Sequence, residues 1–116
     1  MKNKKIILRG IPASPGKAEG RVRILPSVED AEKKFKAGDI IVTHMTDPNW
    51  VIYMKKAKAI ITNSGGALSH AAIVSRELGI PCIVGTKIAT DILKDNMTII
   101  INGEEGIIYE TKNSSK

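Results

Sequence analysis

Residues 59–84 read AIITNSGGALSHAAIVSRELGIPCIV and predict a strand, a glycine loop, a helix and a second strand in immediate succession. The apolar run at 59–62 is typical of a buried strand, and CIV after Pro81 is a second run of the same kind. Between them we predict a helix over His70–Leu78, because Gly79 followed closely by a proline is a normal signal for the end of a helix. This order of elements favours a mixed α/β fold.

The same alternation continues on both sides of this stretch. Ser27 can cap one helix and Asp47, followed by a proline, can cap another, whereas IIVT between them is typical of a buried strand. A short strand is predicted over Arg21–Leu25, after a turn-rich loop over 12–20. Two apolar runs around Asn102–Gly106 indicate a hairpin. We therefore expect several short strands to form a core sheet and about three helices to cover it.

The length of the chain predicts one domain over residues 1–116, because single domains commonly contain about 100 to 150 residues. Hydrophobic residues make up 42% of the chain, which suffices for a packed core, but aromatic residues make up only 3%, so the core must be mostly aliphatic. The segment TKNSSK at 111–116 has no apolar side chain to bury, and we expect it to be a frayed tail.

Basic residues outnumber acidic ones by 18 to 12, and the excess is concentrated near the N-terminus, where Lys17, Arg21 and Arg23 follow an earlier run of lysines. A basic face can attract nucleic acid, an acidic protein or a phosphorylated ligand, and it can equally be a solvated surface. The scarcity of aromatic side chains leaves few platforms on which bases could stack. Nucleic acid is therefore disfavoured as a partner.

No segment has the features of a secretory signal or a membrane span. The apolar run after the N-terminal lysines stops at Arg9, whereas a signal peptide needs about 7 to 15 apolar residues. No run approaches the length of a transmembrane helix. The single cysteine, Cys82, excludes an intramolecular disulfide. We expect a soluble cytoplasmic protein without a membrane partner.

Three features converge at the start of the helix that we predict from His70. Gly65 and Gly66 allow a sharp turn and leave bare backbone N–H groups. Ser69 is a candidate N-cap, which places His70 among unpaired N–H donors at the positive end of the helix dipole. Positive potential favours the neutral, nucleophilic imidazole and then stabilises a bound phosphoryl group by about 0.3 to 1 kcal/mol. The pattern is compatible with a phosphoryl acceptor, and equally with a structural histidine after an ordinary glycine turn.

Other chemistries find little support in the sequence. His44, His70 and Cys82 do not have the spacing of a metal site, so we expect no metal to be bound by the domain itself. GGALSH does not match the nucleophile elbow of serine hydrolases. NSGGALS lacks the lysine of a phosphate-binding P-loop, which argues against independent binding of ATP.

The stretch GGALSHAAIVSRELGIPCIVGT resembles the phosphohistidine signature of phosphoenolpyruvate-utilising enzymes, a family that includes phosphoenolpyruvate synthase, pyruvate phosphate dikinase and enzyme I of the bacterial sugar phosphotransferase system. The resemblance extends to MTDPNW, NGEEGIIY and ASPGKAEGRV, and so to nearly the whole chain. It implies a swivelling β/β/α phosphohistidine domain in which His70 is the catalytic residue that accepts a phosphoryl group. By the same resemblance Gly65, Gly66, Ser69 and Thr46 bind or surround that group.

The resemblance also implies partners. In the family, this domain moves between an ATP-binding module and a phosphoenolpyruvate/pyruvate-binding module, so we expect such partner subunits or domains, with magnesium bound on them together with ATP or phosphoenolpyruvate. On this reading the chain is a phosphotransferase component, not a complete enzyme. The alternative is a non-catalytic module that keeps the fold and binds protein or nucleic acid through its basic surface.

Two details of the motif qualify the resemblance. Many members have threonine two residues before the histidine, where this chain has Leu68, so regulation through a hydroxyl at that position is not expected. Arg76 and Glu77 lie in the stretch that resembles the family's RELGIP, and a structural salt bridge is at least as good an explanation for them as a functional role.

Overall fold

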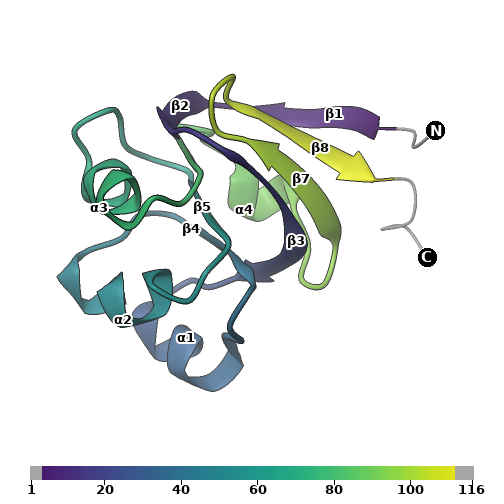
Figure 1. The fold of residues 1–116 in the computed structure, drawn as a ribbon. Coiled ribbons are helices and arrows are strands. Elements are labelled where there is room, and N and C mark those ends of the chain that lie inside the picture. Colours follow the sequence, from purple (N-terminus) through teal and green to yellow (C-terminus); the bar gives the residue numbers. More distant parts are fainter. Residues whose placement is uncertain (1–3, 112–116) are drawn as a thin grey trace.

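The computed structural model describes residues 4–111 and builds them into strands and short helices arranged in three layers (Figure 1). The strands are β1 (Lys4–Arg9), β2 (Ile11–Ser14), β3 (Lys17–Ile24), β4 (Ile40–Thr43), β5 (Ala59–Thr62), β6 (Cys82–Val84), β7 (Thr98–Asn102) and β8 (Ile107–Thr111). The helices are α1 (Val28–Lys34), α2 (Val51–Met54), α3 (His70–Leu78) and α4 (Ala89–Ile92), and the 3₁₀ turn η1 (Pro48–Trp50) leads into α2.

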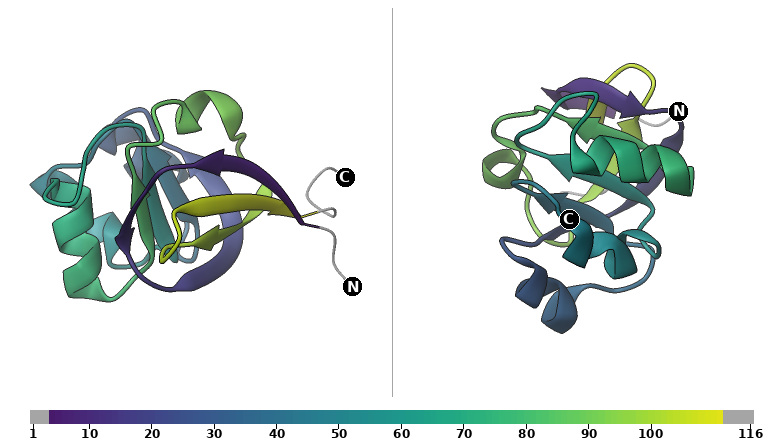
Figure 2. Two further views of the ribbon diagram at one scale, coloured as in Figure 1. Left: turned by 90° about the horizontal axis from the view of Figure 1, so that it is seen from above. Right: turned by 90° about the vertical axis from the view of Figure 1, so that its left-hand side faces the viewer.

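Strand β3 connects two differently built parts of the sheet, whose strand order is β1-β8-β7-β3-β4-β5-β6-β2. Its first part, Lys17–Arg21, pairs antiparallel with β7, and its last part, Val22–Ile24, pairs parallel with β4. The strand therefore passes from an antiparallel layer of β1, β8 and β7 into a parallel layer of β4, β5 and β6. The two views of Figure 2 show the antiparallel layer folded over one face of the parallel strands, with α1, α2 and α3 on the other. This is the expected β/β/α arrangement.

Alternating side chains of the parallel strands fill the spaces on both faces. Ile41 of β4 points toward the helices and packs in a cluster with Trp50 and Met54. Its neighbours Ile40 and Val42 point the other way, into a second cluster formed with side chains of the antiparallel layer and of α4. All are at most 4% exposed, which explains why IIVT is a continuous apolar run and not an alternating one.

Several helix boundaries agree with the sequence prediction. Ser27 caps α1 in a reciprocal capping box with Asp30, and the side chain of Asp47 caps η1 by accepting from the Asn49 N–H at 2.9 Å. Helix α3 spans His70–Leu78, and Gly79 ends it in the left-handed conformation at φ +74°.

The predicted turn-rich loop over 12–20 is wrong, because most of it is strand. Residues 11–14 form β2, and only the residues around Gly16, at φ +119°, turn before β3 begins. Pro12 is tolerated because β2 lies at the edge of the sheet and pairs only with β6. Helix α4 was also not predicted, since a single turn carries too little periodicity to be recognised.

The frayed tail predicted over 111–116 is wrong for its first residue. Thr111 is the last residue of β8, where it is buried and pairs with Lys4 of β1, and residues 112–116 lie outside the described residues. Within residues 4–111, no helix combines the length and the apolar character needed to cross a membrane.

Candidate functional site

The candidate site lies where the parallel strands β4 and β5 end. The loops that leave these strands run side by side, because the Asn63 N–H donates to the Thr43 carbonyl at 3.1 Å and the Ser64 N–H donates to the His44 carbonyl at 3.0 Å. The Ser64 hydroxyl donates to the same His44 carbonyl at 3.0 Å. These bonds bring Thr46, which follows β4, next to the glycine loop that follows β5. Ligand sites of α/β sheets are typically found at this carboxyl edge.

His70 is the first residue of α3 and is half-buried, with its ring against Thr46. The Thr46 Oγ1 and His70 Nδ1 atoms are 2.8 Å apart, and Thr46 itself is 4% exposed. Across residues 4–111, no protein hydrogen bond to the other ring nitrogen, Nε2, is present. The ring is therefore held through one nitrogen while the second has no competing protein partner.

The two glycines of the loop have different structural roles. Gly65 has φ +105°, and a Cβ there would lie 2.9 Å from the Ser69 Oγ, so the position requires glycine on both counts. Gly66 is outside the positive-φ region, and a Cβ there would meet nothing within 4 Å. Only Gly65 is thus needed to shape the loop, whereas the sequence analysis assigned the same role to both glycines.

Ser69 occupies the N-cap position of α3, as predicted, but its hydroxyl does not cap the helix. It donates to the Gly66 carbonyl at 2.8 Å, and the Ser69 N–H contacts the same oxygen at 3.0 Å. The side chain therefore tightens the glycine loop. It leaves the N–H groups of the first helical turn available to another acceptor, such as an anion.

A cavity of about 210 Å³ opens beside the His70 ring. It is large enough for several water-sized groups of about 30 Å³ each. Four of the five predicted site residues line this cavity, namely Thr46, Gly65, Ser69 and His70. Gly66 is not among the lining residues. The lining residues are Met45, Thr46, Thr62, Ser64, Gly65, Ser69, His70 and Ala71.

Arg76 is a part of this region whose contacts sequence reasoning missed. A structural salt bridge was one of the two explanations left open for it, but within residues 4–111 Arg76 forms none, and its guanidinium donates to the carbonyl oxygens of Ala13 and Ala67. Both acceptors are backbone atoms that only the fold brings close to Arg76, so the sequence does not indicate these contacts. Its position in the motif was the only reason to single out Arg76.

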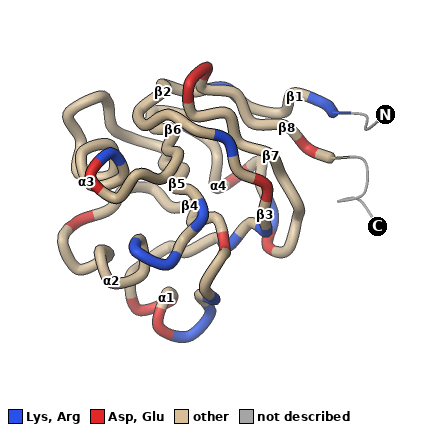
Figure 3. The backbone as a smooth tube through the Cα atoms, in the orientation of Figure 1, with Lys and Arg blue, Asp and Glu red and all other residues tan. Residues whose placement is uncertain are grey.

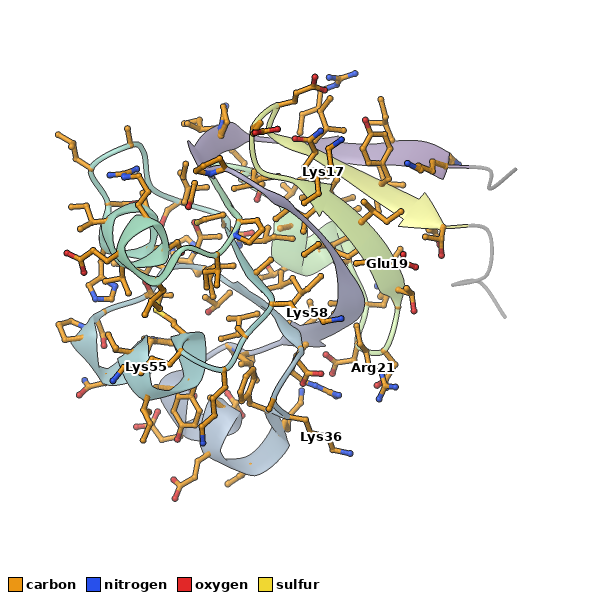
Figure 4. The ribbon with its side chains drawn as sticks, in the orientation of Figure 1. Lys17, Glu19, Arg21, Lys36, Lys55 and Lys58 are labelled. Carbon is orange, nitrogen blue, oxygen red and sulfur yellow. The ribbon has the colours of Figure 1, made fainter. Side chains whose placement is uncertain are left out.

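A second group of basic residues lies away from the His70 cavity. In Figure 3, Lys and Arg positions are seen on β1, α1 and α3 as well as along β3 and in the loops that precede β4 and β5. Figure 4 shows Arg21, Lys36 and Lys58 in one region, where they line a shallow depression of about 400 Å³. Lys36 and Lys58 come before β4 and β5, whereas the His70 cavity lies after them, so the two regions occupy opposite edges of the parallel strands.

The donor chemistry of metal sites is not found in the described residues. Across residues 4–111, no three His, Cys, Asp or Glu side chains are grouped so that they could hold a metal ion.

Comparison with known proteins gives a consistent result. A family described as "PEP-utilising enzyme, mobile domain" matches residues 35–106. The phosphoenolpyruvate synthase of Aeropyrum pernix is 56% identical over 104 residues, and a probable phosphoenolpyruvate synthase of Archaeoglobus fulgidus is 52% identical over 112 residues. These alignments cover 90% and 97% of this chain but only 13% and 15% of the relatives, so the chain spans about a seventh of their length.

Solved structures agree on the fold. A solution structure of enzyme I has a TM-score of 0.57 at 30% identity, covering 65% of this chain and 31% of that one. Aconitase X of Thermococcus kodakaraensis has a TM-score of 0.68 at 23% identity, covering 94% and 98% of the two chains, and this likeness concerns the fold alone.

Proposed function

From the premise that this chain belongs to the mobile-domain family of phosphoenolpyruvate-utilising enzymes, we propose that it is a phosphoryl carrier in which the Nε2 atom of His70 accepts and returns the phosphoryl group. The observation that carries this proposal is the 2.8 Å contact between the Thr46 Oγ1 and the His70 Nδ1. The threonine hydroxyl can accept from Nδ1 or donate to it, and in the proposed reactive tautomer Nδ1 carries the hydrogen and donates to Thr46, which leaves the lone pair on Nε2.

The chemistry follows from that tautomer. The Nε2 lone pair attacks phosphorus and forms a P–N bond, while the bond from phosphorus to the donor's leaving group breaks and the leaving group keeps its electron pair. The ring gains positive charge in this step, and the Nδ1–H bond to the Thr46 oxygen stabilises that charge. The first-turn N–H groups of α3 are suited to receive the phosphoryl oxygens.

Donor and acceptor belong to other modules in this proposal. An ATP-binding partner and a phosphoenolpyruvate/pyruvate-binding partner supply them, and magnesium enters with the ligands of those partners. The relatives support this division, because the matched segment is a small part of each phosphoenolpyruvate synthase.

A small donor tests the carrier chemistry without any partner. We expect phosphoramidate to phosphorylate the chain: the Nε2–P bond forms, the P–N bond of the donor breaks, and its protonated amino group leaves with the bonding pair as ammonia, which then takes up a proton from water. The adduct should be labile in acid and stable in base. His70→Ala should abolish the adduct, and His44→Ala, which removes the other histidine, should leave it unchanged. An adduct that survives in His70→Ala, or no adduct on the folded wild-type chain, would overturn the proposal.

A further inference from the structure

Arg76 joins three segments of the chain through its guanidinium. The Nη1 atom donates to the Ala13 carbonyl at 2.8 Å, and the Nη2 atom donates to the Ala67 carbonyl at 2.7 Å. Ala13 is buried in β2, and Ala67 lies in the glycine loop just before α3. One side chain of α3 therefore ties the loop both to the helix and to the edge strand of the sheet.

The loop depends on a few such ties because it has no ladder of backbone hydrogen bonds. Ser64 anchors its beginning to the His44 carbonyl, and Ser69 holds the Gly66 carbonyl from the other end. Between them, the Ala67 carbonyl is contacted by Arg76, and Leu68 is 84% exposed. Without Arg76, no side-chain hydrogen bond within residues 4–111 would hold the Ala67 peptide.

The geometry of the peptide bond passes this constraint along the loop. The C=O of one residue and the N–H of the next point in opposite directions across a planar trans peptide. Fixing the Ala67 oxygen therefore fixes the direction of the Leu68 N–H, directly before Ser69 and His70. This contact therefore constrains the orientation of the peptide between Ala67 and Leu68, two residues before α3 begins.

We propose that Arg76 is a positioning residue for phosphoryl transfer, which holds the glycine loop and the entry of α3 in the conformation that presents Nε2 and the first-turn N–H groups together. This inference rests on the proposed function of His70. Arginine suits the role because its planar fork can bridge two carbonyl oxygens, whereas a lysine ammonium is a point charge on a flexible stem.

The test compares phosphoramidate uptake by Arg76→Lys, Arg76→Ala and, as a matched control, Glu77→Gln, each in the full chain. Both Arg76 variants should take up the phosphoryl group on the order of 10-fold more slowly. The reacting groups are still present in these variants, but they are less well positioned for the reaction. Arg76→Lys keeps the positive charge but lacks the planar fork. It therefore distinguishes a positioning effect from an electrostatic effect of the positive charge. Hydrogen exchange of the Ser69 and Ile73 amides, which donate to the Gly66 and Ser69 carbonyls, should accelerate in both variants, while exchange in β4 and β5 stays unchanged.

The outcomes distinguish a failure of the positioning role of Arg76 from a failure of the proposed function of His70. If the wild-type chain is not phosphorylated, the proposed function fails first. If wild type reacts and both Arg76 variants react within twofold of it, or if Arg76→Lys alone restores the wild-type rate, the positioning role is wrong. Unfolding of Arg76→Lys at 25 °C would also overturn it, because Arg76 would then serve the stability of the whole domain.

Discussion

The two nitrogens of the His70 ring have different surroundings, and the proposed phosphoryl transfer depends on this difference. Nδ1 lies 2.8 Å from the buried Thr46 hydroxyl, whereas Nε2 has no protein partner within residues 4–111. A hydrogen bond that selects the tautomer is a common way to free one ring nitrogen for chemistry. In the proposed reaction, Thr46 acts through the ring that it holds.

Thr46→Val should slow phosphoryl uptake from phosphoramidate. Valine has a similar shape but cannot accept from Nδ1, and a hydrogen bond of about 0.5 to 1.5 kcal/mol corresponds to a rate lower by about 2-fold to 10-fold. Thr46→Ser keeps the hydroxyl and should retain most of the wild-type rate. Equal rates for the valine and serine variants would show that the hydroxyl is not involved.

The glycine pair should respond unequally to alanine. Gly65→Ala combines φ +105° with a contact of 2.9 Å to the Ser69 Oγ and should lower the free energy of unfolding by about 1 to 3 kcal/mol. Gly66→Ala meets open space and should change it by less than about 0.5 kcal/mol. Urea unfolding followed by circular dichroism measures both, and similar losses at the two positions would contradict the roles assigned here.

At the residue scale, the sequence singled out four residues that line the candidate cavity but did not predict their contacts. Ser69 was expected to cap α3, because a serine before a helix usually does, but its hydroxyl turns to the Gly66 carbonyl that the loop brings within 2.8 Å. The bonds of Arg76 to Ala13 and Ala67 depend on β2 lying beside α3. No short sequence pattern around Ser69 or Arg76 predicts either of these hydrogen-bond arrangements.

The packing of α3 against β6 determines the behaviour of the single thiol. Cys82 is the first residue of β6, is fully buried, and its Sγ lies 3.8 Å from the Ala71 carbonyl of α3. Burial raises the pKa of the Cys82 thiol to about 11, so hardly any thiolate is present near neutral pH. Since the thiolate is the reactive form, the side chain is inert as long as α3 stays in place.

Cys82 should therefore resist Ellman's reagent at pH 8 in the native chain and react fully in urea. A Leu68→Cys, Cys82→Ala variant provides the control, because position 68 is 84% exposed and its thiol should react at the rate of a free peptide. Fast reaction of Cys82 in the native protein would mean that α3 separates readily from β6.

At the scale of elements, the prediction succeeded where local signals were strong. The limits of α3 follow from Ser69 and Gly79, and the hairpin of β7 and β8 follows from two apolar runs around a turn. It failed for β2, whose proline and polar neighbours resemble a loop. This segment becomes a strand only through pairing with β6, a partner distant in the sequence.

The layered architecture was expected from the family resemblance, and the chain achieves it by letting β3 belong to both sheets. Long-range ties then hold the layers together. Asp95 accepts from the Ile24 N–H of β3 at 2.6 Å through Oδ1 and from Lys34 of α1 at 3.0 Å through Oδ2. The three residues come from distant parts of the sequence, which is why no sequence pattern indicated this contact.

This contact predicts a pH dependence of stability. Partial burial acts to raise the pKa of Asp95, but the hydrogen bond from Ile24 and the bond and charge of Lys34 outweigh it, so the pKa is lowered in the folded chain. The carboxylate therefore contributes stability above its ordinary pKa of about 3.9, and the contribution is lost as the pH falls through the lower folded value. Asp95→Asn should be less stable than wild type in urea at pH 7, and the gap should shrink at acidic pH. A gap independent of pH would show that charge is not responsible.

The most direct test of the account is to identify the atom that carries phosphorus in the intact chain. With ¹⁵N-labelled histidine and phosphoramidate as donor, the coupling between ³¹P and ¹⁵N identifies the bonded nitrogen. We predict coupling to the Nε2 of His70 alone. Coupling to the Nδ1 of His70, or to either nitrogen of His44, would contradict the proposal that Thr46 holds one side of the ring so that the other can receive the phosphoryl group.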